Sequence, residues 1–188
     1  MDAFLTSVFT VALAEIGDKT QLLSLFLIAR FNKPWSIISG ICVATLANHA
    51  ASAGAGAWLG QFLQSEAGRW IISGSFIAVG LWLLIPDKED TPTSRWDGYG
   101  AFLVSTILFF LAEIGDKTQI ATVLLGAHFS LPVIVTLGTT VGMLLANVPV
   151  VFLGAALMRH IPFRTARIVA AVVFIATGIY TLWAGSVQ

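Results

Sequence analysis

The chain has 188 residues, of which 57% are hydrophobic and 11% charged, and its formal net charge is zero. Its mean hydropathy of +0.88 excludes an ordinary soluble domain and indicates a polytopic membrane protein. The balanced charge, without a basic tract, argues against nucleic-acid binding, so the lipid bilayer is the one large partner that the composition implies.

Six stretches are long and apolar enough to be transmembrane helices, because a span needs about 20 predominantly apolar residues. In chain order they cover residues 3–29, 36–62, 68–86, 98–126, 131–157 and 166–186. The first stretch does not have the pattern of a signal peptide, since it lacks a basic beginning and carries Glu15, Asp18 and Lys19 near its centre. We therefore predict an all-α membrane protein with six transmembrane helices.

The two halves of the chain repeat each other at the constant offset of 98 residues that separates Glu15 from Glu113. Further matching positions are Ala3-Phe4-Leu5 with Ala101-Phe102-Leu103, Pro34 with Pro132, Gly40 with Gly138, and Arg69 with Arg167. Because each half holds three spans, an odd number, the second half must enter the membrane from the opposite side. We expect a 3+3 inverted-topology repeat, with three-helix units at 1–85 and 98–188 joined by a charged linker at 86–97.

The distribution of lysine and arginine predicts the orientation in the membrane. One side carries most of these residues: Arg30, Lys33, Lys88, Arg95, Arg159, Arg164 and Arg167. The other side has only Arg69. Since cytoplasmic loops are the richer in basic residues, we expect the linker in the cytoplasm and both termini outside.

The sequence Leu-Ala-Glu-Ile-Gly-Asp-Lys-Thr-Gln occurs twice, at residues 13–21 and 111–119, in the middle of the first and fourth stretches. A charged residue at the bilayer centre costs roughly 2.5 to 3.5 kcal/mol, so such residues mark a functional site. Residues three apart share a helix face, which predicts that the glutamate and aspartate of each copy point the same way. The glycine between them weakens the helix and allows a partly unwound segment with exposed carbonyl oxygens.

An inverted repeat brings the two motif-bearing helices together near the membrane midplane, where we expect their carboxylates to converge. The candidate metal-binding residues are Glu15, Asp18, Glu113 and Asp116, with the side-chain amides of Gln21, Gln119, Asn48 and Asn147. Such a set of oxygen ligands suits hard divalent cations such as Ca²⁺ and Mn²⁺. Lys19 and Lys117 balance part of the charge and leave an excess of two negative charges, which one divalent ion or two protons would neutralise.

Protons are expected to compete with the metal for these oxygens, because several carboxylates in a low dielectric are not readily ionised together. A purely structural interpretation is the alternative: Glu15 with Lys19, and Glu113 with Lys117, have the i,i+4 spacing of helix salt bridges. It would leave both aspartates unpaired and is therefore less favoured.

Polar residues in the second and fifth stretches have open roles. Asn48 and Asn147 are equally compatible with a ligand or gating role and with hydrogen bonds that hold helices together. His49 lies beside Asn48, but the fifth stretch has no matching histidine, so a role as proton carrier is less favoured.

The paired motifs, Glu15 to Thr20 and Glu113 to Thr118, resemble the Glu-x-Gly-Asp-Lys/Arg-Thr/Ser motifs of a family of cation/proton exchangers. That family includes Golgi manganese and calcium transporters of eukaryotes and bacterial manganese exporters. The resemblance covers essentially the whole chain, and the short linker makes it similar to the bacterial members. It implies a secondary transporter, not an enzyme and without a bound cofactor, that exports Mn²⁺, or less favourably Ca²⁺, across a bacterial inner membrane in exchange for protons.

Three other functions are compatible with the residues alone. An amino-acid exporter would hold a zwitterion between the charged side chains, a divalent-cation channel would need a continuous polar pore, and a structural membrane subunit would need no facing carboxylates. The sequence also leaves open whether two copies associate as a homodimer.

Overall fold

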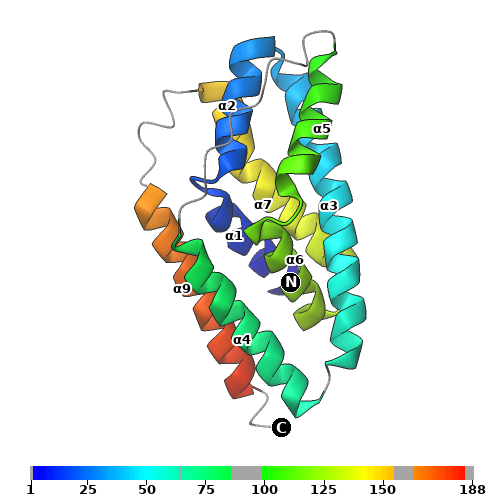
Figure 1. Ribbon diagram of the computed structural model, residues 1–188, viewed down its shortest axis with the longest axis vertical. Coiled ribbons are helices and arrows are strands. Elements are labelled where there is room, and N and C mark those ends of the chain that lie inside the picture. The colour runs from blue at the N-terminus through cyan, green and yellow to red at the C-terminus, as the bar shows by residue number, and fades with distance from the viewer. Residues whose placement is uncertain (1, 64, 86–98, 155–162, 185–188) are drawn as a thin grey trace.

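The computed structural model describes residues 2–63, 65–85, 99–154 and 163–184, and the secondary structure of these residues is entirely α-helical. Figure 1 shows the helices in one bundle. In chain order they are α1 (Asp2–Glu15), α2 (Lys19–Phe31), α3 (Pro34–Phe62), α4 (Glu66–Leu83), α5 (Ala101–Glu113), α6 (Lys117–Phe129), α7 (Pro132–Leu153) and α9 (Phe163–Ala184). The predicted linker at 86–97 lies outside the described residues.

Two predicted spans are broken in the middle, at the same place in each repeat. The break between α1 and α2 contains Gly17 with φ +84°, and the break between α5 and α6 contains Gly115 with φ +75°. Both angles lie in the left-handed region, which glycine adopts without steric cost. The glycine was expected to weaken the helix, and in the structure the helix is interrupted at this point in both copies. The prediction that the glutamate and aspartate of each copy share a helix face is wrong, because a helix ends between them.

The turns that follow also repeat. The C-cap residues that follow α2 and α6 are Asn32 and Ser130, with left-handed φ values of 49° and 53°. The next helices, α3 and α7, both have a proline in the first turn, where its missing N–H costs no hydrogen bond. The local sequence therefore produces the same helix, break, helix and turn twice.

One helix crossing is the same in both repeats. Helix α5 packs on α3 so closely that a Cβ at Gly40 would lie 2.7 Å from the Phe102 carbonyl oxygen. Helix α1 packs on α7 in the same way, and a Cβ at Gly138 would lie 2.7 Å from the Phe4 carbonyl oxygen. These residues correspond to one another in the repeat, so the two crossings are related by it.

A second helix crossing differs between the repeats. A Cβ at Gly60 of α3 would lie 2.6 Å from the Ala127 carbonyl oxygen of α6, and Gly56 lies even closer to Val123. In the corresponding crossing of α7 with α2, the nearest atom to a Cβ at Gly154 is Leu25 Cδ1, at 3.9 Å. The α3 and α6 helices are thus in backbone contact, whereas at Gly154, the residue that caps α7, the atom of α2 within 4 Å of an added Cβ belongs to the Leu25 side chain.

The remaining helices, α4 and α9, pack against each other at the end of the bundle where α3 and α6 are in close contact (Figure 1). Phe76 and Phe174, which correspond in the repeat, meet between them with ring centroids 6.1 Å apart. Among the described helices, α3 and α7 are long and apolar enough to cross a membrane by themselves, and the apolar parts of α1, α5 and α9 are shorter.

Candidate functional site

Both copies of the repeated motif lie in the interior of the bundle, at the two helix breaks. Glu15 and Glu113 are the last residues of α1 and α5 and are fully buried. Asp18 and Asp116 are the N-cap residues of α2 and α6 and are buried as well. A carboxylate at a helix N-terminus is stabilised by the helix dipole and the free N–H groups there. Each break therefore places one acid at a helix end and one at a helix start.

The two copies contact each other through their charges. Lys19 Nζ of the first copy lies 3.1 Å from Asp116 Oδ2 of the second. Asp116 Oδ1 also accepts a hydrogen bond of 2.6 Å from the Lys117 N–H. Glu15 lies within electrostatic reach of both Glu113 and Asp116. The expected meeting of the two motif-bearing breaks is thus present in the structure.

The carboxylates do not all gather at one point, however. Among the residues that the structure describes, no three side chains of histidine, cysteine, aspartate or glutamate are placed to hold one metal ion together. Glu15 Oε2 accepts a hydrogen bond of 2.5 Å from Thr20, while Glu15 Oε1 and both oxygens of Glu113 are buried without a hydrogen-bond partner. The two copies are thus joined by the Lys19–Asp116 ion pair, and both glutamates keep buried oxygen atoms without a hydrogen bond.

The two glutamines of the motif complete the helix breaks. Gln21 Oε1 accepts a hydrogen bond of 2.9 Å from the Gly17 N–H, and Gln119 Oε1 accepts one of 2.7 Å from the Gly115 N–H. Gln21 also donates to the Ala146 carbonyl oxygen of α7 at 2.9 Å. The amide oxygens predicted as metal ligands are therefore engaged with the backbone of their own motif.

The two asparagines connect neighbouring helices. Asn48 of α3 donates a hydrogen bond of 3.0 Å to the Phe110 carbonyl oxygen of α5. Asn147 of α7 accepts one of 2.8 Å from Ser24 of α2 and donates one of 3.2 Å to the Met143 carbonyl oxygen. In this structure both asparagines therefore form hydrogen bonds that hold neighbouring helices together.

The two lysines have different surroundings. The Lys19 side chain is 28% exposed and reaches across to Asp116. Lys117 is buried, donates a hydrogen bond of 2.6 Å to the Ile85 carbonyl oxygen after α4, and lies 5.8 Å from the centre of the Trp82 ring. The difference arises where the end of α4 contacts the second copy, which the repeated sequence alone did not predict.

His49 is the residue that the sequence undervalued. It is fully buried on α3, and its Nε2 lies 3.3 Å from Glu113 Oε2. The contact depends on the crossing of α3 with α5, which places a second-stretch residue beside the fourth-stretch motif. Its position next to Asn48, at the centre of an apolar helix, was the available signal.

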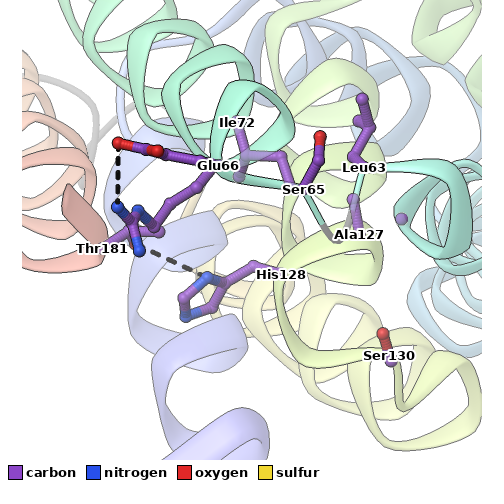
Figure 2. A pocket seen from close by; sticks show the side chains of 10 residues that line it. Leu63, Ser65, Glu66, Ile72, Ala127, His128, Ser130 and Thr181 are labelled. Atoms are coloured by element: carbon purple, nitrogen blue, oxygen red, sulfur yellow. Dashed lines mark hydrogen bonds and ion pairs between the residues drawn. The ribbon is translucent and has the colours of Figure 1, made fainter. Parts of the chain in front are cut away.

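A separate pocket lies at the end of the close contact between α3 and α6. It encloses about 690 Å³ and is lined by Gly60, Leu63, Ser65, Glu66, Arg69, Ile72, Ala127, His128, Ser130 and Thr181. Figure 2 shows Glu66 and His128 on different sides of this pocket. Its lining residues come from helix ends and from α4 and α9, so the pocket is distinct from the two motif copies.

Comparisons with known proteins agree with the two-part organisation of the chain. The model of the family described as "Divalent cation/proton antiporter GDT1" matches residues 3–91 and 101–188, one segment in each half. A "Putative manganese exporter" of Vibrio cholerae is 48% identical over 96% of this chain and 90% of its own length. More distant are a GDT1-like protein of Synechocystis, 23% identical over 97% of this chain and 98% of its own, and GDT1-like protein 3 of Arabidopsis thaliana, 25% identical over 93% of this chain and 68% of its own. No solved structure matches the chain.

Proposed function

Since this chain belongs to the GDT1 family of divalent cation/proton antiporters, we propose that it exports Mn²⁺, or less favourably Ca²⁺, from the cytoplasm in exchange for protons. One observation carries the proposal. Two buried copies of an acidic motif, each at a broken helix, contact each other through Lys19 and Asp116 at 3.1 Å. Broken helices whose ends face one another in a membrane protein are typical of ion sites in secondary transporters.

The proposed architecture has six transmembrane spans in a 3+3 inverted repeat. Helices α1 and α2 form one broken span, α5 and α6 form another, and α3, α4, α7 and α9 form the other four. The duplicated crossings at Gly40 and Gly138 support a repeat, and so do the separate family matches to the two halves. In line with the lysine and arginine distribution, the linker at 86–97 faces the cytoplasm of a bacterial inner membrane and both termini lie outside.

The difference between the two helix crossings supports alternating access. One crossing, of α3 with α6, is closed by glycines in backbone contact, and the corresponding crossing of α7 with α2 is looser. In an inverted repeat, the opposite state is obtained when the two halves exchange these conformations. The binding site would then open to one side of the membrane at a time.

The proposed ligands are the carboxylates of Glu15, Asp18, Glu113 and Asp116. Of these, Glu15 and Glu113 carry buried oxygens without a hydrogen-bond partner, which a cation can use. The side-chain amide oxygens of Gln21, Gln119, Asn48 and Asn147 complete the set as the breaks rearrange. A divalent cation must displace the Lys19 ammonium from Asp116, so that cation binding and this ion pair exclude each other.

Exchange with protons follows from competition for the same oxygens. Protonation of a carboxylate removes the charge that binds the metal, so metal affinity falls where the solution is more acidic. Cytoplasmic Mn²⁺ binds where protons are scarce and is displaced outside where they are abundant. The proton gradient across the inner membrane thereby drives export.

Purified protein in vesicles with a trapped pH-sensitive dye tests this function. We expect that Mn²⁺ added outside enters while protons leave, so the lumen becomes alkaline and the external medium acidic. Asp116→Asn should abolish the response, because it removes an anionic oxygen. Mn²⁺ uptake at an unchanged rate without proton movement would identify a channel, and uptake of amino acids without metal dependence would identify an amino-acid exporter. Either result would contradict the proposal.

A further inference from the structure

The environment of His49 is unusual for a buried histidine. Its side chain has no exposed surface, and neither ring nitrogen has a hydrogen-bond partner in the described structure. A buried polar group without a partner costs about 1 to 3 kcal/mol, so such a group is kept where it has a task. The task is indicated by the atom that it faces, because Nε2 lies 3.3 Å from Glu113 Oε2.

The second repeat has no imidazole at the position that corresponds to His49. Asn147 occupies the position that corresponds to His49, and its side chain is hydrogen-bonded to Ser24 and Met143. Glu15, which corresponds to Glu113, is likewise hydrogen-bonded to Thr20. The two repeats therefore also differ here, where the His49 imidazole faces the Glu113 carboxylate and neither group is hydrogen-bonded.

The separation of these two atoms fits two ligands of one ion. Metal–ligand bonds of about 2.2 Å at right angles place neighbouring donor atoms roughly 3.1 Å apart. The observed 3.3 Å between Nε2 and Oε2 is close to this distance. A neutral imidazole supplies a nitrogen lone pair to a metal ion. The proposed ligands of the motif supply oxygen atoms only.

We propose that His49 is a ligand of the transported cation, together with Glu113, and that it selects transition-metal ions such as Mn²⁺ against Ca²⁺ and Mg²⁺. This inference rests on the proposed transport function and names the substrate class of the same site. Ca²⁺ and Mg²⁺ take oxygen ligands almost exclusively, whereas imidazole nitrogen is an established ligand for first-row transition metals. An all-oxygen site would have to distinguish Mn²⁺ from Ca²⁺ by cavity size, ligand number and rigidity.

Pulsed electron paramagnetic resonance of Mn²⁺ bound to the detergent-solubilised protein tests the ligand directly. We expect a ¹⁴N coupling from a directly bound imidazole in the wild-type protein. It should be lost in His49→Asn, which installs the residue of the second repeat, and should remain in His128→Asn, a histidine outside the motif region. Bound Mn²⁺ without this coupling in the wild-type protein would overturn the inference, and that result needs no variant to fold.

Selectivity supplies the second measurement. The measured quantity is the ratio of the Ca²⁺ and Mn²⁺ concentrations at which Ca²⁺ halves Mn²⁺ uptake into vesicles. This ratio should be roughly tenfold or more lower in His49→Asn than in the wild type, and His49→Gln should show the same decrease. His128→Asn, at a histidine that lines the separate pocket, is the control and should leave the ratio unchanged. Equal losses for both ions in the His49 variants would show that His49 only positions Glu113. If the wild-type protein neither bound nor moved Mn²⁺, the proposed function itself would fail, and the two failures are thus distinguishable.

Discussion

The two copies of the motif are identical in sequence over nine residues, yet they occupy different environments. Both form a helix break closed by a glutamine side chain. In the first copy, Lys19 is partly exposed and pairs with Asp116, whereas in the second copy Lys117 is buried and bonded to the backbone after α4. The comparison teaches that the nine residues determine the break, and that the neighbouring helices determine what each charge contacts.

The helix crossings likewise include one that is alike in the two repeats and one that differs. The crossings at Gly40 and Gly138 are alike, whereas the close contact of α3 with α6 has a looser counterpart. Part of that difference lies in the sequence, because Gly126 of α6 corresponds to the bulkier Ile28 of α2. The asymmetry therefore reflects both the conformation and the side chains at the crossing.

The largest expected effect tests whether the copies are equivalent in function. Glu15→Gln and Glu113→Gln should each reduce Mn²⁺ transport to roughly a hundredth or less, because loss of a buried charge partner costs about 3 kcal/mol or more. Transport into vesicles is the measurement, with the amount of folded protein checked by gel filtration. If either variant kept wild-type transport, that copy would be structural and a shared site would be excluded.

A smaller effect is expected at the unequal crossings. Gly126→Ile gives α6 the residue of α2, and the added side chain would overlap the Ala53 backbone, so overpacking of about 1 to 3 kcal/mol should separate α3 from α6. We expect transport to fall about tenfold, with a lower unfolding temperature. Ile28→Ala, which shortens the corresponding side chain of α2, should leave most transport intact. Equal effects of both changes would show that the two crossings do not differ in the working protein.

The smallest effect is expected at the lysines. Lys19→Gln removes the ammonium that competes with the cation for Asp116, so the apparent Mn²⁺ affinity should tighten by up to roughly fivefold, the size expected for a partly exposed pair. Lys117→Gln should not tighten it, since that ammonium is bonded to the Ile85 carbonyl oxygen. Titration of Mn²⁺-dependent transport compares the two. Weaker binding in Lys19→Gln would mean that the lysine orients Asp116 for the cation.

The sequence predicted those features that depend on local chemistry. The all-helical fold, the paired motifs and the weakness at Gly17 and Gly115 follow from composition, repetition and the conformational freedom of glycine. The shared helix face of each glutamate and aspartate was wrong, because helical spacing was applied across a point where the helix ends. Periodicity gives no warning of a break inside an apolar stretch.

The sequence did not predict which side chains of the two repeats contact each other. Lys19 and Asp116 are distant along the chain, and their pairing depends on how the two breaks face each other. His49 meets Glu113 only because α3 crosses α5, and a repeat comparison counted its lack of a partner histidine against it. The second repeat has asparagine where the first has His49, and this difference made a role for His49 less favoured. In the structure the same difference places an imidazole beside only one of the two motif glutamates.

The hydrogen bonds of Gln21 and Gln119 to the glycines four residues before them have a consequence for how such a protein can arise. A helix broken inside a membrane ordinarily depends on neighbouring segments to satisfy its freed backbone groups. Here a side chain encoded within the same nine residues satisfies one of them. On the proposed inverted topology, a gene segment that encodes this unit can be duplicated, and the second copy of its product can enter the membrane in the opposite orientation without a new partner for that N–H group. Descent from a smaller ancestor, in which one such gene product paired with an inverted copy of itself, thereby becomes chemically accessible.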